Sequence, residues 1–377
     1  MKKRVFLIVL DSLGAGEAPD AKAFGDEGAH TLHTLYKTGE LKINTLKSLG
    51  IGNIEGLEFF GKCYQPYASV AKLCEKSNGK DTIVGHWEIA GHISKYPLPT
   101  FPCGFPESIL NKIRKISDRP ILCNKPYSGT KVIEDFGAEA LENGALIVYT
   151  SADSVLQIAA HTDVVSLDEL YRICSELRVE LIDADECVGR IIARPFNTDK
   201  EGRFVREANR KDFSLAPPKN LLPESIKNSC FESIAIGKIN DIFSGQGFTQ
   251  TQSTHSNEEG MKLLDKYVSE DFSGLCFANL VDFDMLWGHR RDALAYANGL
   301  NVFDTWLDGF IAKMCDDDVL IITADHGCDP GFDKSTDHTR EYVPYIEYSK
   351  NANPKNYGIV DGFGFVSSRV FDLLGIK

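Results

Sequence analysis

Three apolar runs in the chain have the same form, because each is followed closely by an acidic residue. The runs are residues 5–10, 275–281 and 319–324, and the acids that follow them are Asp11, Asp284 and Asp325. Near-continuous apolar runs of this kind are typical of parallel strands that are covered on both faces. In open α/β sheets the ligand crevice lies at the carboxyl ends of the strands. The pattern therefore predicts an α/β core with three carboxylates at one edge of its sheet.

The same parts of the sequence also contain three imidazoles. His326 follows Asp325 directly, His289 lies shortly after Asp284, and His338 lies shortly after His326. A single acid after a strand is more often a helix cap or a turn former, so the argument depends on the whole set of six. Carboxylate and imidazole together suit Mn, Zn or Fe, whereas sites made only of oxygen suit Mg or Ca. Six such ligands are enough for a two-metal centre.

Thr82 is the candidate nucleophile, in the Gly-Lys-Asp-Thr segment at residues 79–82. A threonine ahead of a helix is also a common N-cap, and the sequence leaves both interpretations open. A threonine hydroxyl is a weak nucleophile unless a base or a metal ionises it, and the predicted metal centre can do so. The glycine-rich turn at residues 12–19 lacks the dinucleotide and P-loop signatures, so we expect no nucleotide there.

Two breaks in the sequence predict an inserted domain. Prolines crowd residues 97–106, and a second break occurs at Pro217 and Pro218. The residues between these breaks have strand-like and helix-like patterns, and they predict a compact α+β unit at residues 100–216. Because metal-ligand candidates lie on both sides of this insert, residues 1–99 and 217–377 must form one discontinuous catalytic core. We expect the insert to be a cap for substrate recognition.

Four polar residues are candidates for substrate binding. Ser151 and Asp153 follow a strand-like run in the insert, and their hydroxyl and carboxylate groups suit sugar hydroxyls. Arg190 suits phosphate because its guanidinium can bind two oxygens, and Lys238 is a second phosphate candidate in the core. Turn capping and surface charge are the alternative explanations for each of these residues.

Composition narrows the class of protein. The net charge of −13 argues against a nucleic-acid partner. The apolar run at residues 5–10 ends without a signal-peptide cleavage site, so we interpret it as a core strand, and no run reaches the ~20 residues of a membrane helix. Ten cysteines without disulfide spacing predict mostly buried, reduced thiols in a cytoplasmic protein. No obligate protein partner is evident.

Several segments together resemble the phosphopentomutase family of the alkaline phosphatase superfamily. These segments contain Asp11, residues 80–88, Asp284 with residues 289–291, residues 325–327 and residues 336–339. Further matching segments in the insert are residues 124–130, 150–161 and 190–196. Ala-Asp-His-Gly at residues 324–327 alone would indicate only the superfamily, so the complete set carries the resemblance.

The resemblance implies an isomerase that interconverts α-D-ribose 1-phosphate and D-ribose 5-phosphate, and the 2-deoxyribose equivalents. It implies a phosphothreonine at Thr82, a bisphosphate intermediate, and glucose 1,6-bisphosphate or a similar sugar bisphosphate as priming activator. It implies two Mn²⁺ ions, of which one is held by Asp284, His289 and His338 and the other by Asp11, Asp325 and His326. Ser151, Asp153, Arg190 and Lys238 would face the pentose phosphate. The implied fold is an alkaline-phosphatase-like core with a central, mostly parallel sheet flanked by helices, plus a smaller inserted α+β cap.

The chain departs from the family pattern at two positions, and other functions remain open. Val84 stands where the family usually has a second hydroxyl, and His30 stands near the position of an acid. Neither change affects a predicted metal ligand. The nearer alternatives are a metal-dependent phosphatase and a cofactor-independent phosphoglycerate-type mutase, and release of free phosphate separates a hydrolase from a mutase. The remote alternative is a non-catalytic protein that binds metal or sugar phosphate.

Overall fold

A computed structural model describes residues 3–151, 154–181 and 186–376 of the chain. The chain divides into two compact units, which are described separately. The larger unit combines Met1–Lys95 with Pro217–Lys377, and the smaller unit is Tyr96–Ala216. The role of the smaller unit as a substrate-binding cap stays a prediction.

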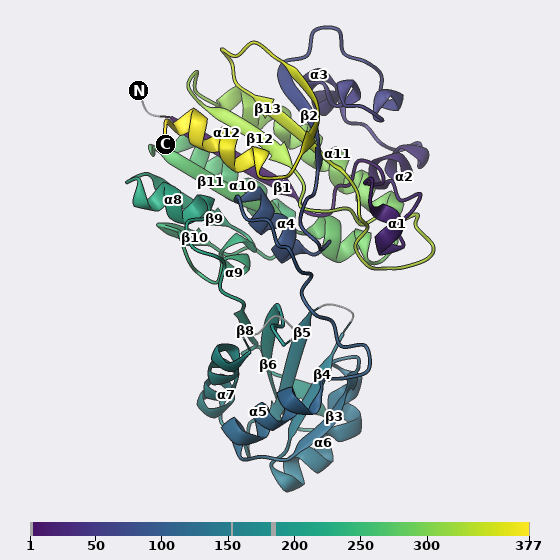
Figure 1. Ribbon diagram of the computed structural model, residues 1–377, viewed down its shortest axis with the longest axis vertical. Coiled ribbons are helices and arrows are strands. Elements are labelled where there is room, and N and C mark those ends of the chain that lie inside the picture. The colour runs from purple at the N-terminus through teal and green to yellow at the C-terminus, as the bar shows by residue number, and fades with distance from the viewer. Residues whose placement is uncertain (1–2, 152–153, 182–185, 377) are drawn as a thin grey trace. The chain divides into compact units, whose positions relative to one another are not determined.

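The larger unit is built on an eight-stranded sheet (Figure 1). In sheet order the strands are β10 (Gln250–Gln252), β9 (Glu232–Ile236), β11 (Gly274–Leu280), β1 (Arg4–Leu10), β12 (Val319–Thr323), β13 (Val343–Tyr348), β2 (Ala68–Cys74) and β14 (Asn356–Asp361). Only β13 is antiparallel to its neighbours, β12 and β2. The sheet is therefore mostly parallel, which confirms the predicted fold class.

The three predicted core strands lie next to one another in register. Strand β1 pairs in parallel with β11 on one side and with β12 on the other, and Val9 lies opposite both Asn279 and Thr323. All residues of these strands are buried, as their apolar sequences predict. Because parallel strands in register end together, the residues that follow them meet at one edge of the sheet.

Helices flank this sheet (Figure 1). They are α1 (Ala21–Phe24), α2 (Thr31–Lys37), α3 (Asn44–Leu49), α4 (Thr82–Ile89), α8 (Leu222–Asn228), α9 (Ile239–Ile242), α10 (Asn257–Ser269), α11 (Ala293–Lys313) and α12 (Phe365–Leu374). The short helices η1 (Ile51–Asn53), η2 (Glu58–Phe60) and the π-helix η3 (Phe283–Gly288) complete the unit. Helix α12 packs against β1 and α4, and helix α10 packs against β11 and α11.

The smaller unit is a six-stranded sheet with helices on both faces. Its strands are β3 (Ile121–Pro126), β4 (Leu146–Thr150), β5 (Val155–His161), β6 (Arg190–Thr198) and β7 (Phe204–Arg206) in that order, with β8 (Lys211–Ser214) beside β6. Alternate residues of β4 point to opposite faces, as expected for a strand. Leu146 and Val148 pack with α5 (Glu107–Ser117) and α7 (Leu167–Glu180), whereas Ile147 and Tyr149 pack with α6 (Lys131–Asn143).

The cysteines differ in part from the prediction. All ten lie in the described ranges and all are free, but only Cys174, Cys276 and Cys328 are buried. The expectation that most are buried was wrong, because Cys230 and Cys315 follow the ends of helices α8 and α11 and are exposed there. No helix in the described part of the chain is long and apolar enough to cross a membrane.

Candidate metal centre

Asp284 reaches the carboxyl edge of the sheet through a π-helix and not from a strand end. Strand β11 ends at Leu280, and Asp284 lies in η3. The backbone N–H of His289 donates to the carbonyl oxygen of Asp284, so the two residues are five apart within one wide turn. That turn places the Nε2 atom of His289 3.4 Å from Oδ1 of Asp284. Single π-turns of this type are frequent at functional sites.

Two groups of potential ligands share Asp284. Asp284, His289 and His338 form the first group, and the Nε2 atoms of the two imidazoles are 3.1 Å apart. Asp11, Asp284 and His326 form the second group, in which Oδ1 of Asp11 lies 3.5 Å from Nε2 of His326. The ligand atoms within each group lie within 4.8 Å of one another. The five side chains therefore converge on one small region.

Asp325 lies beside the second group. Its Oδ2 atom is 3.3 Å from Nε2 of His326, and its Oδ1 atom accepts a hydrogen bond from the backbone N–H of Ser12. The resemblance implies that Asp325 is a ligand together with Asp11 and His326, whereas the second group contains Asp284 in its place. The role of Asp325 as a ligand stays a prediction.

The charges of this region fit a metal ion. Oδ1 of Asp11 is buried and has no hydrogen-bond partner among the described residues, whereas Oδ1 of Asp284 is buried with the Nε2 atoms of His289 and His338 each 3.4 Å away. Burial, together with the nearby carboxylates of Asp325 and Asp284, raises the pKa of Asp11 to about 8. Burial also lowers the pKa of His326 to about 4, so its imidazole is neutral, which is the form that binds metal. A divalent cation would supply the positive charge that these carboxylates lack and a partner for Oδ1 of Asp11.

Thr82 lies directly beside these ligands. It is the first residue of α4, and its Oγ1 atom is 3.2 Å from Nε2 of His326. The N-cap of the helix is Asp81, whose side chain accepts hydrogen bonds from the backbone N–H groups of Ile83 and Val84. The interpretation of Thr82 as the N-cap was therefore wrong. The cap is the preceding residue, and it leaves the Thr82 hydroxyl available to the ligand group.

Two buried polar residues that sequence reasoning missed connect Thr82 to the ligands. His86 is one turn further along α4, with its Nδ1 atom 2.8 Å from the carbonyl oxygen of Thr82 and 3.1 Å from Oδ2 of Asp325. Asn279 in β11 donates to Oδ2 of Asp11 and lies 3.3 Å from Nε2 of His86. The signal for His86 was its spacing of four residues from Thr82, which places both on one helix face.

Helix α4 also packs directly on the backbone of the ligand loop. A Cβ atom added to Gly85 would lie 2.1 Å from the carbonyl oxygen of Asp325. No side chain fits there without movement of the backbone, so glycine allows this close approach. The position of Thr82 relative to Asp325 and His326 is therefore set partly by backbone contact.

Arg340 joins the loop that contains His338 to the segment that leads to Thr82. Its guanidinium, which is almost completely buried, donates to the carbonyl oxygens of Gly79 at 2.6 Å and Glu75 at 2.9 Å. The guanidinium also forms ion pairs with the carboxylates of Glu75 and Asp20. These charge-assisted hydrogen bonds fix Glu75 and Gly79, which precede Thr82 in the chain.

The predicted substrate residues lie in both units. Lys238 follows β9 in the larger unit. Burial raises the pKa of Asp11, and the positive charge of Lys238 opposes this rise. The ammonium group is thus within electrostatic reach of the ligands. In the smaller unit, Ser151 directly follows β4, and the backbone N–H of Arg190 donates to the carbonyl oxygen of Ser154, which directly precedes β5. Asp153 lies outside the described residues.

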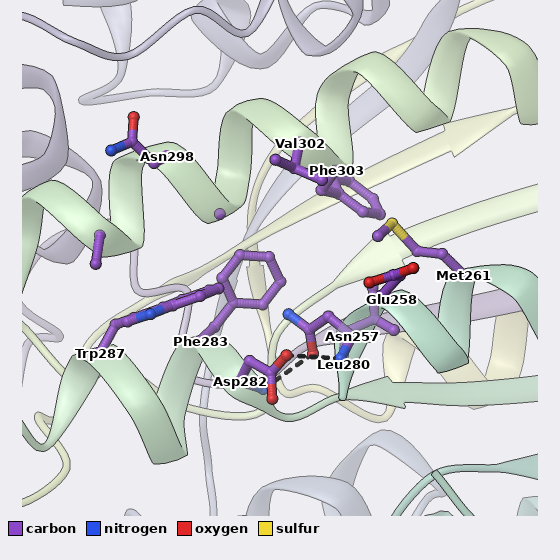
Figure 2. A pocket seen from close by; sticks show the side chains of 12 residues that line it. Asn257, Glu258, Met261, Leu280, Asp282, Phe283, Trp287, Asn298, Val302 and Phe303 are labelled. Carbon is purple, nitrogen blue, oxygen red and sulfur yellow. Dashed lines mark hydrogen bonds between the residues drawn. The ribbon is translucent and has the colours of Figure 1, made fainter. Parts of the chain in front are cut away.

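A cavity of about 480 Å³ lies beside η3 in the larger unit (Figure 2). Its wall is mostly apolar and includes Phe283 and Trp287 of η3, Met261 of α10 and Val302 of α11. None of the predicted metal ligands is among the described residues that line it. The cavity and the ligand groups are therefore separate features, although Phe283 directly precedes Asp284 in the chain.

The mostly parallel sheet and the two ligand groups are the features expected of a metalloenzyme with an α/β core. Consistent with this class, a family model described as the metalloenzyme superfamily matches residues 3–377. A solved structure, the PH0037 protein from Pyrococcus horikoshii, is similar with a TM-score of 0.51 and 11% identity, and the match covers 100% of this chain and 98% of that one. At this identity the likeness concerns the fold alone.

Other relatives are much more similar to this chain in sequence than the PH0037 protein is. A phosphopentomutase from Lachnoclostridium phytofermentans is 48% identical, and the match covers 99% of this chain and 96% of the relative. A phosphopentomutase from Clostridium kluyveri is 47% identical, with coverage of 100% and 96%. The chain belongs to the phosphopentomutase family of the metalloenzyme superfamily. It is an enzyme of the isomerase class, and the predicted resemblance is confirmed.

Proposed function

We propose that the protein interconverts α-D-ribose 1-phosphate and D-ribose 5-phosphate, and the 2-deoxyribose equivalents. The near-full-length relatives that are named phosphopentomutases support this pentose phosphate mutase activity. The observation that carries the mechanism is the distance of 3.2 Å between the Thr82 hydroxyl and Nε2 of His326. A nucleophile at this distance from a metal-ligand group is suited to accepting and donating a phosphoryl group.

The proposed cofactor is a pair of Mn²⁺ ions. Asp284, His289 and His338 would hold one ion, and Asp11, Asp325 and His326 would hold the other. The mixed carboxylate and imidazole donors, and the buried oxygen of Asp11 that has no partner among the described residues, support a transition metal. When bound, two such ions lower the pKa of an attacking hydroxyl and neutralise charge on the entering and leaving oxygens.

The chain itself positions the nucleophile. Asp81 caps α4 and fixes the first turn, in which Thr82 is the first residue. His86 contacts the carbonyl oxygen of Thr82 and the carboxylate of Asp325, so helix and ligand loop are held together. Phosphoryl transfer depends mostly on this kind of positioning and on charge stabilisation.

In the proposed cycle, phosphorylated Thr82 donates its phosphoryl group to a free hydroxyl of the pentose monophosphate. The bond from phosphorus to the Thr82 oxygen breaks, a bond to the sugar oxygen forms, the proton of the sugar hydroxyl ends on the Thr82 oxygen, and a pentose bisphosphate results. The other phosphoryl group of this bisphosphate then returns to Thr82, so the number of phosphoryl groups on the enzyme is unchanged. Glucose 1,6-bisphosphate, or a similar sugar bisphosphate, would supply the first phosphoryl group.

Substrate recognition is assigned to Ser151, Asp153, Arg190 and Lys238. Hydroxyl and carboxylate groups suit the sugar hydroxyls, and the two cations suit the phosphate. A smaller unit that closes on the substrate would exclude water, which otherwise hydrolyses the phosphothreonine. The ten free cysteines support a cytoplasmic enzyme, and its proposed partners are small pentose phosphates.

A single assay separates this function from a phosphatase. The purified protein is incubated with Mn²⁺, a trace of glucose 1,6-bisphosphate and ribose 5-phosphate, and both ribose 1-phosphate and free phosphate are followed. We expect ribose 1-phosphate to approach equilibrium with little free phosphate. Free phosphate released in proportion to substrate consumed would instead identify a phosphatase.

A further inference from the structure

His338 reaches the first ligand group on a loop that is far from the other two ligands in the chain. Asp284 and His289 belong to one wide turn of η3, whereas His338 lies 49 residues beyond His289. The Nε2 atoms of the two imidazoles are nevertheless 3.1 Å apart. Contacts between η3 and residues 333–338, which we call the His338 loop, therefore determine where this ligand lies.

The backbone anchors the C-terminal side of the His338 loop. Thr339, the next residue, donates its N–H to the carbonyl oxygen of Gly327 at 2.8 Å, and Gly327 donates to the carbonyl oxygen of Thr339 at 3.2 Å. These two hydrogen bonds form a short antiparallel bridge directly after His326. Residues 333–338 are all described and lie in neither a helix nor a strand, so their position depends on contacts with side chains.

Arg291 supplies such contacts on the N-terminal side of the loop. It lies two residues after His289, and its Nη2 atom donates to the carbonyl oxygens of Asp333 and Ser335, both at 2.9 Å. Nη2 carries two hydrogens, so both hydrogen bonds can form at once. Hydrogen bonds from a charged donor are stronger than those between neutral groups. One side chain next to η3 therefore holds two peptide groups of the loop.

The next carbonyl group of the loop contacts the ligand His289. The Nδ1 atom of His289 lies 2.7 Å from the carbonyl oxygen of Thr336. A carbonyl oxygen only accepts hydrogen bonds, so Nδ1 donates and Nε2 keeps the lone pair that binds metal. Histidines that bind metal are commonly oriented by a contact of this kind. Displacement of the His338 loop would therefore affect both imidazoles.

The backbone of Arg291 has a conformation that glycine adopts more easily. Its φ angle is +56°, which is in the left-handed region. Its N–H donates to the carbonyl oxygen of Gly288 at 3.0 Å, at the end of η3. A residue with a Cβ atom is strained in this region, and such strain is often retained where the side chain has a function. The contact with the His338 loop is a function that glycine could not supply.

We infer that Arg291 is a positioning residue of the metal centre, which holds the His338 loop against η3 so that His289 and His338 face the same ion. The inference rests on the metal assignment of the proposed function and deepens it. Arg291 acts through the two imidazoles and is not itself a ligand. Asp11 and the pair Asp325 and His326 follow strands β1 and β12, so the ion assigned to them should not depend on Arg291.

Mn²⁺ binding to Arg291→Gly tests this role. Glycine relieves the backbone strain and removes the guanidinium, so the metal-free variant should melt at or above the Tm of the wild type. Titration of the metal-free protein, followed by the electron paramagnetic resonance of free Mn²⁺, measures both sites. We expect one site to keep its affinity and the other to weaken about tenfold to a hundredfold. Arg291→Lys keeps a cation and should restore part of the lost affinity.

Cys230→Gly and Arg290→Ala are the matched controls. Cys230 is exposed shortly after the end of α8 and has a φ angle of +62°, so its change to glycine relieves the same kind of strain. Arg290→Ala removes the neighbouring exposed arginine, whose Nε atom lies 3.5 Å from the carbonyl oxygen of Met285 in η3 itself. Both variants should bind Mn²⁺ as the wild type does.

Hydrogen exchange of the metal-free proteins gives a second readout that needs no metal. The N–H groups of Asp337 and His338 form hydrogen bonds within the loop, so they should exchange about tenfold faster in Arg291→Gly, whereas those of β12 should not change. Unchanged affinity for both ions in Arg291→Gly, or equal weakening of both, would overturn the inference. A wild type that binds no Mn²⁺ would instead overturn the proposed cofactor itself, so the two failures are distinguishable.

Discussion

The ligand groups of the larger unit and the arginine cluster of the smaller unit (Tyr149 with Arg194, Arg206 and Arg210) carry opposite charges. Each contains a buried polar atom that has no hydrogen-bond partner among the described residues. In the larger unit, Oδ1 of Asp11 is buried without a hydrogen-bond partner among the described residues, and burial and the neighbouring carboxylates raise the pKa of Asp11. In the smaller unit, the hydroxyl of Tyr149 is buried near arginines and has no hydrogen-bond partner in the part of the chain that the structure describes. An unpaired buried charge costs far more free energy than an unpaired neutral hydroxyl, so a cation is expected beside Asp11, whereas Tyr149 requires no ligand.

The largest expected effect concerns the nucleophile. Thr82→Val keeps the shape of the side chain but removes the hydroxyl beside His326, so we expect no mutase turnover and no phosphorylation. Intact-mass and peptide analysis after priming should place one phosphate on Thr82 in the wild type. Thr305→Val, on the exposed face of α11, is the matched control and should stay active. An active Thr82→Val enzyme, or phosphate on Ser12 or Ser151, would contradict the assignment.

Removal of a shared ligand should be almost as damaging. Asp284→Asn and His338→Ala should lose metal occupancy and activity together, because Asp284 belongs to both ligand groups. Mn²⁺ at about a hundred times its Kd should stabilise the wild type by about 2.7 kcal/mol and should stabilise Asp284→Asn far less. Elemental analysis and thermal melting with and without Mn²⁺ measure both effects. Full activity of the wild type after exhaustive chelation would refute the metal mechanism.

Gly85→Ala tests whether backbone packing positions the nucleophile. The added methyl group would lie 2.1 Å from the carbonyl oxygen of Asp325, so α4 must move away from the ligand loop. Overpacking of this kind destabilises a protein by about 1–3 kcal/mol, and a shift of about 1 Å lowers turnover by about a hundredfold. Gly309→Ala in α11 is the control, because no described atom lies within 4 Å of its added methyl group. Equal kcat values for the two variants would mean that the contact has no role in positioning.

Arg190→Ala should have a smaller effect that falls on the substrate and not on the metals. Loss of a charge-assisted contact to phosphate corresponds to about 1.5–3 kcal/mol, or about a tenfold to hundredfold lower mutase rate. Phosphorylation of Thr82 should survive, and the ratio of free phosphate to isomerised product should rise as water competes. Arg203→Gln, which removes an exposed arginine that pairs with Asp199, is the control. An unchanged ratio with an unchanged rate would mean that Arg190 does not contact substrate.

The sequence predicts the two regions unequally, for physical reasons. Asp11 directly follows one buried parallel strand, and Asp325 lies one residue beyond its neighbour. The apolar pattern of the sequence alone therefore places both at one edge of the sheet. The apolar run before Asp284 and His289 after it predict Asp284 as a ligand. Its π-helix was not predicted, because a turn with hydrogen bonds between residues five apart has no simple sequence period. Tyr149 lies within an apolar run of the sequence, so its hydroxyl was not predicted to have a role. Only the folded structure shows that it lies near Gly129 and Arg206.

Tyr149→Phe should have the smallest effect of these variants on the free energy of unfolding. It is the counterpart in the smaller unit of Asp284→Asn in the larger unit. Removing a buried hydroxyl that has no partner removes its desolvation penalty, so we expect the free energy of unfolding to stay constant or to rise by up to about 1 kcal/mol. Thermal melts of the wild type and the variant, both with Mn²⁺ chelated, measure this difference. If Tyr149→Phe instead loses about 1 kcal/mol or more, the hydroxyl already has a partner in the free protein, and the comparison between the two regions fails.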